Sequence, residues 1–585
     1  FSFSMRLIWV EQFSSTEQFK FNNEFMINTN DGYYYAEGAR DILAGNTVNT
    51  NDRSPFTSSP SVLTAFLVDN LPFSFETILF YMPAFFASLL VIPLILIGKK
   101  FNNLEFGFIS ALLASIAWSY YNRTMVGYYD TDMLNIVFPT ILLWSLIWAI
   151  DTKKDIYLLL TAVDIIAYRW WYPQSYALEF SFFALIILYL IYLIFKYKNT
   201  SQKLYQNKEI AYVIQLVTIM IIAMVQLDMQ LRMMLVFGYF MLFRQERWHK
   251  HLYIMFVMTF ILFMATGGLS PILNKLQHYI FTDTVAVYSE GLKLHFYTVM
   301  QTIREAGKIS FETFANRISG HSITFILSVL GYVWLCYRHK IMILALPMLG
   351  LGFLALSGGL RFTIYAVPVM AMGIAFLICE VSGLISKQFI NTIIKRVVHY
   401  GLLSFFTLLV LYPNIKHIIS YKIPTVFTKN EVIVLDKLKN IANREDYVIS
   451  WWDYGYPIRY YSDVKTLSDG SKHGGSINFP ISLILTNSQE KSSKMARLDV
   501  EYTEMRFNPT DSNLTLAASN IEQMTLDYGY DNTNDFLYAL ETELVLPQKT
   551  RDIYLYLPQR LLNILPTVDL FSNIDLMTGK QGHRP

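Results

Sequence analysis

Long runs of apolar residues dominate the first 413 positions of the chain. The runs lie at residues 77–98, 104–120, 134–150, 156–170, 179–195, 210–228, 231–243, 252–268, 322–337, 341–357, 364–384 and 394–413. A helix needs roughly 20 apolar residues to cross the hydrocarbon core of a bilayer, and these runs reach or approach that length. Residues 1–10 are apolar but too short, so we interpret them as the remnant of a first span whose beginning is missing. Together the segments predict a polytopic α-helical membrane protein with about 13 transmembrane helices.

Basic residues gather in alternate loops between these runs. They are Lys99, Lys100, Lys153, Lys154, Lys196, Lys198, Lys203, Arg244, Arg247, Lys250, Arg338, Lys340, Lys387, Lys395 and Arg396. Short loops rich in Lys and Arg remain on the cytoplasmic side of a membrane, so we predict that these loops are cytoplasmic. The other loops then face outward, including a long loop at about residues 269–321.

After residue 413 the pattern changes to short alternations of polar and apolar positions. Residues 432–442 have helical spacing, whereas residues 446–452 and 552–557 have the composition of strands. We therefore predict a transmembrane domain at 1–413, with catalytic outer loops, and an outward mixed α/β domain at 414–585. The second domain has no clear closing element, so we expect it to be truncated at its C-terminus.

Composition supports the membrane interpretation. Hydrophobic residues make up 53% of the chain and charged residues only 16%, which is too apolar for a soluble globular protein. The net charge of +2 predicts no nucleic-acid partner. Cys336 and Cys379 lie in apolar runs and are more typical of buried residues than of a disulfide or metal site.

Several ionisable residues occupy the outward ends of the apolar runs. Asp31 lies in an early outward loop, and Asp130 and Asp132 form a DxD pair seven residues after Arg123. Alternate carboxylates can approach one divalent cation, and their oxygens favour Mg²⁺ or Mn²⁺ over zinc. A lone DxD pair also occurs in solvated loops and helix caps. Its place at membrane depth, where ionisable groups are costly, favours a functional role.

Three further charged residues lie on the predicted outward side. Arg361 follows small residues in Ser-Gly-Gly-Leu-Arg-Phe, a setting in which a guanidinium group can hold a lipid-bound phosphate. Glu305 and Arg317 belong to the long outward loop. The alternative interpretation of both is that they are solvent-exposed helix charges.

The segment Trp-Trp-Asp-Tyr-Gly at 451–455 opens the polar region. The indole rings of Trp451 and Trp452 can pack on a methyl group while their N–H groups and the oxygens of Asp453 form hydrogen bonds. Such a pocket suits a small side chain with a hydroxyl group. The alternative is that both tryptophans are half-buried strand residues.

This segment and its continuation, YP and RYYSD at 459–463, resemble the signature of the catalytic subunit of oligosaccharyltransferases, most closely the single-subunit bacterial enzymes. NDGYYYAEGARD, NRTMVGYYDTD, QTIREA, NRISG and SGGLRFTIYAVPVM resemble further family motifs in the same order. The resemblance implies a GT-C type fold and a bacterial inner-membrane location with a periplasmic active site. It also implies inverting, en bloc transfer of an oligosaccharide from a polyprenyl pyrophosphate to Asn in (Asp/Glu)-X-Asn-X-Ser/Thr sequons, by a monomer.

The resemblance further implies a metal site for Mn²⁺ or Mg²⁺. Its ligands would be Asp31, Asp130, Asp132 and Glu305. Asp31 and Glu305 would also hydrogen-bond the acceptor amide and weaken its delocalisation, and Arg123 would orient the catalytic carboxylates. Much of the catalysis would then be orientation.

Other residues would bind the two substrates. Trp451, Trp452 and Asp453 would bind the Ser or Thr hydroxyl of the sequon. Ile564 would contact the threonine methyl, and Arg317 would pair with the acidic residue two positions before the acceptor Asn. The lipid-linked oligosaccharide would meet Arg361, Tyr172, Tyr456 and His473.

One motif departs from the bacterial pattern. That pattern begins with Met, whereas this chain has Leu561, followed by Ile564 and Val568. Leucine conserves the volume of methionine, so we expect the contact of Ile564 to persist.

Two other functions remain open at this level. One is a lipid-phosphate-dependent glycosyltransferase that acts on lipid or polysaccharide and needs neither the WWDYG segment nor Arg317. The other is a transporter in which Asp164 and Arg169 form a coupling pair, although no matching broken helices support it. We expect Asp164 and Arg169 to satisfy each other or the interior of the helix bundle.

A sequon in the polar domain yields a prediction. Asn513 heads Asn-Leu-Thr and has Asp511 two positions earlier, in the position that Arg317 would bind. We expect Asn513 to become glycosylated when the chain is co-expressed with a complete glycan pathway, as measured by intact mass. Modification of a control acceptor without any occupancy of Asn513 would contradict this.

Overall fold

A computed structural model describes residues 1–47, 54–198, 207–272, 285–288, 291–298, 308–507, 517–542 and 544–581. The chain forms two compact units. The first, here called the helical unit, comprises residues 1–13, 81–280 and 305–422, and the second, called the mixed unit, comprises residues 14–80, 281–304 and 423–585. The mixed unit thus contains two segments that precede residue 413, because α3 packs on α24 and β4 packs on α25 within it. These boundaries differ from those expected from the sequence.

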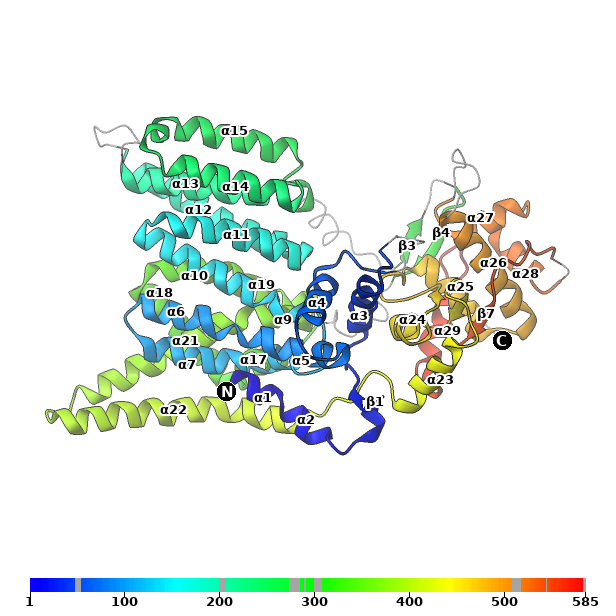
Figure 1. Ribbon diagram of the computed structural model, residues 1–585, viewed down its shortest axis with the longest axis horizontal. Coiled ribbons are helices and arrows are strands. Elements are labelled where there is room, and N and C mark those ends of the chain that lie inside the picture. The colour runs from blue at the N-terminus through cyan, green and yellow to red at the C-terminus, as the bar shows by residue number, and fades with distance from the viewer. Residues whose placement is uncertain are drawn as a thin grey trace. The chain divides into compact units, whose positions relative to one another are not determined.

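Helices make up the described part of the helical unit. They are α1 (Ser2–Arg6), α2 (Ile8–Phe13), the greater part of α5 (Phe75–Ser88), α6 (Val91–Lys100), α7 (Leu104–Ser115), α8 (Trp118–Asn122), α9 (Asp132–Asn135), α10 (Val137–Thr152), α11 (Asp155–Trp171), α12 (Tyr176–Lys196), α13 (Lys208–Met224), α14 (Met229–Phe243), α15 (Leu252–Ala265), α17 (Phe311–Ser319), α18 (Ser322–Arg338), α19 (Leu346–Phe353), α20 (Ala355–Gly358), α21 (Thr363–Ser386) and α22 (Thr392–Ser420), joined by short 3₁₀ turns. Figure 1 shows α10 to α15 as rows of helices lying side by side. Every apolar run found in the sequence corresponds to one of these helices or to two in succession.

Six of the described helical segments are long and apolar enough to cross a membrane. They are Phe75–Lys100, Asp132–Thr152, Pro173–Lys196, Lys340–Gly358, Leu360–Ser386 and Thr392–Ser420. A seventh would be α17 with α18, which are bent by 70°. Several other apolar helices, such as α14 and α15, are shorter, so the number of about 13 spans stays a prediction.

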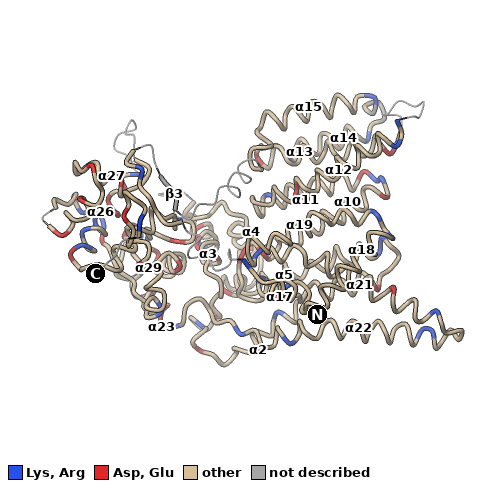
Figure 2. Tube along the Cα trace, turned by 180° about the vertical axis from the view of Figure 1, so that it is seen from behind, with Lys and Arg blue, Asp and Glu red and all other residues tan. Residues whose placement is uncertain are grey.

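The basic loops of the helical unit lie at one end of its helices. Figure 2 shows Lys and Arg gathered at that end. Lys100, at the end of α6, lies 2.6 Å from Asp151 at the end of α10, and Lys153 lies 3.7 Å from Glu209 at the start of α13. These ion pairs join three loops that the sequence assigned to the same side of the membrane.

The described part of the mixed unit contains helices and three small sheets. Its helices are α3 (Asn30–Leu43), α4 (Ser59–Asn70), α23 (Lys429–Lys439), α24 (Gly455–Ser462), α25 (Gly475–Thr486), α26 (Gln489–Phe507), α27 (Asn520–Asp527), α28 (Thr533–Ala539) and α29 (Leu565–Ser572). Its strands are β1 (Lys20–Phe21), β2 (Glu24–Phe25), β3 (Val285–Tyr288), β4 (Leu294–Tyr297), β5 (Tyr447–Ile449), β6 (Lys465–Thr466) and β7 (Ile553–Leu555). β1 with β2 and β3 with β4 form antiparallel pairs, and β6, β5 and β7 form a parallel sheet in that order.

The parallel sheet positions the WWDYG segment. All three residues of the central strand β5 are buried, as expected for a parallel strand covered on both faces. The predicted helix at 432–442 corresponds to α23, which begins earlier because Thr428 and Glu431 form a capping box. The predicted strand at 446–452 is shorter than expected, since β5 ends before the tryptophans and the chain turns into a 3₁₀ helix.

A buried ion triad joins three segments of the mixed unit. Arg459 of α24 lies 3.0 Å from the carboxylate of Glu37 on α3 and 2.9 Å from that of Asp469. All three side chains are almost fully buried. Burial alone would lower the pKa of Arg459, but the two carboxylates raise it above its ordinary value. The guanidinium group therefore remains charged and holds α3 against α24 and the loop at 469–473.

Asp164 and Arg169 do not pair with each other, and of the two expectations it is the interior of the helix bundle that satisfies Arg169. Arg169 instead forms an ion pair with Glu179 on α12 and donates a hydrogen bond of 3.0 Å to the carbonyl of Met224. Residues five positions apart on a helix project about 140° apart, so Asp164 and Arg169 do not face each other. Among the described residues, the Oδ2 atom of Asp164 is buried without a hydrogen-bond partner.

Removing the centre of the triad should destabilise the mixed unit strongly. Arg459→Met would leave Glu37 and Asp469 as buried charges without their partner, at a cost of about 3–5 kcal/mol in the free energy of unfolding. Lys549→Met is the matched control, because it breaks an ion pair with Asp552 in which both side chains are about half exposed, and it should cost less than about 1 kcal/mol. Denaturant unfolding of the purified protein measures both, and equal losses would contradict a structural role for the triad.

Candidate active site

The DxD pair lies in a tightly held turn of the helical unit. Asp132 begins α9, is buried, and forms an ion pair with Arg123, which follows α8. Asp130 is also buried, and its Oδ1 accepts hydrogen bonds from the amide (2.6 Å) and hydroxyl (3.1 Å) of Thr131. The indole of Trp171 donates a 2.7 Å hydrogen bond to the carbonyl of Thr131. The turn is therefore anchored to the end of α11.

Tyr172 and Arg361 of the helical unit lie near the DxD turn. Burial raises the pKa of the Tyr172 hydroxyl to about 12, and Asp132 and Asp130 add to the rise. The guanidinium groups of Arg361 and Arg123 oppose it, so all four charges lie within electrostatic reach of Tyr172. The helical unit thus brings together five of the residues that the sequence singled out.

The turn before Arg361 depends on glycine. Gly359 has φ 100° and ψ 170°, a conformation that L side chains rarely adopt. Arg361 is exposed, and its guanidinium carbon lies 5.2 Å from the ring centre of Phe362. An exposed guanidinium group on a rigid turn can form paired hydrogen bonds with phosphate.

In the mixed unit, Asp31 and Asp453 lie near each other. Asp31 is exposed in the first turn of α3, and Asp453 belongs to the 3₁₀ helix Trp452–Tyr454. Burial, with a smaller contribution from the charge of Asp31, raises the pKa of Asp453 to about 6. Burial, Asp469 and Asp31 likewise raise the pKa of Tyr456. Tyr456 is therefore within electrostatic reach of Asp31.

The two tryptophans differ in their surroundings, and neither belongs to a strand. Trp451 is only 2% exposed and its ring centre lies 5.5 Å from that of Phe571 in an edge contact. Trp452 is half-buried and stacks on His473 with ring centres 4.7 Å apart. Among the described residues, Nε1 of Trp452 is buried without a hydrogen-bond partner. A polar ligand atom that reached this N–H would satisfy it.

The loop that carries His473 is attached to the buried triad. Nδ1 of His473 lies 3.2 Å from the carbonyl oxygen of Asp469, and its own carbonyl accepts a 2.9 Å hydrogen bond from Asn478. Arg459 and Ser471 overcome the effect of burial and lower the pKa of Asp469. The position of the Trp452–His473 stack therefore depends on the triad.

The other predicted binding residues lie in separate places. Ile564 is partly buried immediately before α29 and packs against the core of the mixed unit, to which Leu561 and Val568 belong. Arg317 lies in the last turn of α17, in the helical unit, within electrostatic reach of His417. Glu305 and Asn513 lie outside the described residues.

The described residues fit a divalent cation in the type of donor they offer. Asp130 and Asp132 project carboxylates from one turn, and oxygen ligands are those that Mg²⁺ and Mn²⁺ prefer. No group of three or more His, Cys, Asp or Glu side chains is placed to hold a metal within the described part of the chain. Glu305, the remaining predicted ligand, is not in that part.

Sequence reasoning missed the residues that position the site. Glu37, Asp469 and Arg459 form the triad, and Trp171 anchors the DxD turn. A weak signal existed for Glu37, because it is an acidic residue between Ala and Gly on the side of α3 that is buried. No local pattern marked Asp469 as its counterpart.

Comparisons with known proteins match most of the chain to two family models. A family model described as "Oligosaccharyl transferase STT3, N-terminal" matches residues 5–419, and one described as "STT3/PglB/AglB core domain" matches residues 444–578. The undecaprenyl-diphosphooligosaccharide–protein glycotransferase of Campylobacter jejuni is 44% identical over 99% of this chain and 79% of its own.

Two solved structures from Archaeoglobus fulgidus share the fold. The oligosaccharyltransferase AglB in complex with an inhibitory peptide and a dolichol-phosphate is 14% identical, with a TM-score of 0.58 over 87% of this chain and 68% of its own. A complex of the oligosaccharyltransferase from this organism with Zn and sulfate is 13% identical, with a TM-score of 0.53 over 87% of this chain and 66% of its own.

The raised pKa of Asp453 predicts that the free energy of unfolding falls as the pH rises. The folded chain binds this proton more tightly than the unfolded chain, whose carboxyl titrates near the ordinary value of 3.8. The contribution of the Asp453 carboxyl group to the free energy of unfolding is therefore fully present below about pH 4, where the group is protonated. This contribution is lost as the pH rises through about 6.

Asp453→Asn removes this titration. We expect it to raise the free energy of unfolding by about 2–3 kcal/mol near pH 7.5, with the gain vanishing near pH 4. Unfolding measured at both pH values checks this, with Asp535→Asn, exposed on α28, as the control. A gain that is the same at both pH values would contradict the raised pKa.

Proposed function

This chain belongs to the oligosaccharyl transferase family of STT3, PglB and AglB, and we propose here how its residues carry out the reaction of that family. It is a multi-pass membrane glycosyltransferase that transfers a lipid-linked oligosaccharide to protein in N-glycosylation. The observation that carries the residue-level proposal is the grouping of Arg123, Asp130, Asp132, Tyr172 and Arg361 in the helical unit.

We propose that the donor is a polyprenyl-pyrophosphate-linked oligosaccharide and that the enzyme works as a monomer in the bacterial inner membrane. The basic loops lie together at one end of the helical unit, and basic loops are retained in the cytoplasm. The loops that carry Arg123, Asp130 and Arg361 follow the alternate set of helix ends. This supports an active site that faces the periplasm.

The proposed binding site for the pyrophosphate is centred on Arg361. Its exposed guanidinium group can form two parallel hydrogen bonds with phosphate oxygens, and Tyr172 lies close enough to share the site. As the bond between sugar and phosphate breaks, negative charge grows on the leaving group, which a preorganised cation stabilises. Arg123 does not need to contact the donor, because its ion pair holds Asp132 in place.

The proposed metal site consists of Asp31, Asp130, Asp132 and Glu305. A bound Mn²⁺ or Mg²⁺ would supply Lewis-acid stabilisation of the charge on the departing pyrophosphate. The buried turn with its anchoring hydrogen bond from Trp171 keeps the DxD carboxylates in one orientation. Such preorganisation lowers the cost of bringing two acidic groups to one cation.

The acceptor asparagine is proposed to meet Asp31 and Glu305. These carboxylates accept hydrogen bonds from its NH₂ group, which weakens the delocalisation of the nitrogen lone pair. The nitrogen then attacks the anomeric carbon from the side opposite the pyrophosphate, so the bond between sugar and pyrophosphate breaks and the configuration inverts. The lipid pyrophosphate leaves, and the amide nitrogen gives up one proton to one of these carboxylates. Asp31 is suited to this role because it is exposed on a helix that the buried triad holds fixed.

The sequon hydroxyl is proposed to bind between Trp452 and Asp453, with Trp451 as the buried wall of the pocket. The unsatisfied Nε1–H of Trp452 can donate a hydrogen bond to the hydroxyl oxygen, and the carboxylate of Asp453 can accept a hydrogen bond from the hydroxyl group. Ile564 offers an apolar surface to the methyl group of threonine. Threonine should therefore be preferred over serine by about 1 kcal/mol.

The rival functions have less support. The Campylobacter relative is named for transfer to protein rather than to lipid or polysaccharide. The transporter interpretation required Asp164 and Arg169 to act as a pair. Arg169 instead forms an ion pair with Glu179.

The test is transfer of a lipid-pyrophosphate-linked sugar to a fluorescent peptide that contains Asp-X-Asn-X-Thr. We expect transfer with Mn²⁺, loss of transfer after chelation, and recovery when Mn²⁺ is restored. Arg317→Ala should reduce kcat/KM about tenfold for this peptide, and only slightly for a peptide with Ala in place of Asp. Arg338→Ala, at the basic end of the helices, is the control. Equal losses for both peptides would show that Arg317 does not bind the acidic residue.

A further inference from the structure

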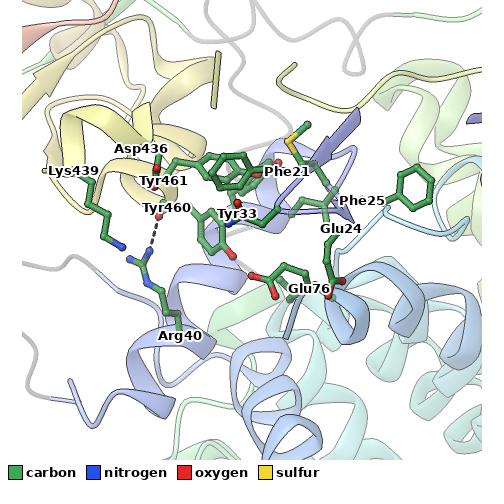
Figure 3. Close-up of a pocket in the computed structure, with 14 residues that line it drawn as sticks. Phe21, Glu24, Phe25, Tyr33, Arg40, Glu76, Asp436, Lys439, Tyr460 and Tyr461 are labelled. Atoms are coloured by element: carbon green, nitrogen blue, oxygen red, sulfur yellow. Dashed lines mark hydrogen bonds between the residues drawn. The ribbon is translucent and has the colours of Figure 1, made fainter. Parts of the chain in front are cut away.

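A separate cavity of the mixed unit lies beside α3 (Figure 3). Its volume is about 370 Å³, and it lies between the β1–β2 hairpin, α3, the start of α5 and the helices α23 and α24. The described residues assigned above to the metal, the sequon or the pyrophosphate do not line it. The cavity is therefore separate from the described residues assigned to those roles.

Aromatic rings form one wall of the cavity. The ring of Tyr33 lies 5.3 Å from those of Tyr460 and Tyr461, and the hydroxyl groups of Tyr33 and Tyr461 are 3.0 Å apart. Phe21 meets Tyr461 edge-on at 6.0 Å. The hydrogen bond between the two hydroxyls and the mutual packing hold these rings rigidly. Tyr33 is buried behind the wall, so the half-buried rings of Tyr460 and Tyr461, which stand edge-on to each other, offer the apolar surface on which the C–H face of a pyranose ring can pack.

The rim of the cavity carries hydrogen-bonding groups of both signs. Glu76, Asp436 and Lys439 line it, and their side chains form no hydrogen bond or ion pair with any other described residue. Figure 3 shows Glu76 pointing toward the hydroxyl end of Tyr460, across the cavity from Lys439. All three side chains are exposed, so a ligand there can both donate to carboxylates and accept from an ammonium group. Neighbouring hydroxyl groups on a sugar do both.

The two other charged residues of the lining are already engaged. Arg40 donates to the carbonyl of Tyr460 and lies 3.2 Å from the carboxylate of Asp463. Glu24 accepts hydrogen bonds from the hydroxyls of Ser74 (2.6 Å) and Thr77 (3.0 Å). With these groups occupied, the rim offers two carboxylates and one ammonium group. This combination favours a neutral, hydroxyl-rich ligand over an anion such as phosphate.

The position of the cavity along α3 relates it to the reaction. Tyr33 and Arg40 line the cavity, and Asp31 lies in the first turn of the same helix. At 1.5 Å per residue, the nine residues from Asp31 to Arg40 span about 14 Å. That distance is longer than one sugar ring and comparable with a short oligosaccharide. A glycan with its first sugar near Asp31 can reach the cavity with a later one.

We propose that this cavity is a carbohydrate subsite that holds a neutral sugar residue of the transferred oligosaccharide beyond the first sugar. The inference rests on the proposed function, because it takes the glycan from the lipid-linked donor. The aromatic wall supplies apolar contact, and Glu76, Asp436 and Lys439 form hydrogen bonds with the sugar hydroxyls. The subsite selects donors by the length of the glycan and leaves the chemistry to the residues described above.

The test compares the wild-type protein, a variant and a control variant with donors of two glycan lengths. The variant is Glu76→Ala with Asp436→Ala, and the control is Glu490→Ala with Asp535→Ala, which also removes two exposed carboxylates from the mixed unit. The donors are a lipid-linked trisaccharide and the lipid-linked monosaccharide with the same first sugar. We expect the variant to raise KM for the trisaccharide donor about fivefold to tenfold and to leave KM for the monosaccharide donor unchanged. The control should change neither KM.

Equal increases for both donors, or an increase confined to KM for the acceptor peptide, would overturn the subsite. A direct measurement separates this outcome from failure of the proposed function. Saturation-transfer NMR with the free trisaccharide should show contact with the wild-type protein and loss of contact in the variant, even if no transfer occurs. Absence of contact with the wild-type protein would overturn the proposal, whereas contact without transfer would count against the proposed function alone.

Discussion

The buried guanidinium group of Arg459 is the constraint on which the mixed unit depends. It lies between the carboxylates of Glu37 and Asp469, with almost no access to water. Three charges can be buried together only when their geometry compensates for lost hydration, so this interaction admits little freedom of position. It determines the place of α3, the helix that follows the WWDYG segment and the loop at 469–473. The positions of the exposed residues that would contact substrate therefore depend on this ion triad.

The helical unit also holds its charged residues in place through fixed partners. Asp132 is held by Arg123, and the peptide between the two aspartates is held by Trp171. In each unit, then, a residue that would meet a ligand is positioned by one that would not. Charged groups near a membrane are costly, and fixed partners keep them ionised and oriented while the surrounding helices remain apolar.

Helix α3 connects several features that are otherwise separate. Its first turn carries Asp31, its buried side carries Glu37, and Tyr33 and Arg40 line the aromatic cavity. A single rigid helix can therefore relate the reacting end of a glycan to a later sugar. The sharp turn of the β1–β2 hairpin closes the cavity from the other side, where Asn22 and Asn23 both adopt positive φ. Asparagine tolerates this conformation better than other residues with a side chain.

The sequence by itself determined the membrane segments, the alternation of basic loops and most of the residues now grouped around Tyr172. These features are local, because a run of apolar residues or a charged loop has the same meaning wherever the chain folds. Only the tertiary structure decided that Arg459 pairs with Glu37, that Arg169 pairs with Glu179, and that residues 14–80 join the C-terminal segment. It also decided that Trp451 lies in the core while Trp452 keeps an unsatisfied N–H. The physical reason is that partners hundreds of positions apart are chosen by packing and burial, which no periodicity along the chain encodes.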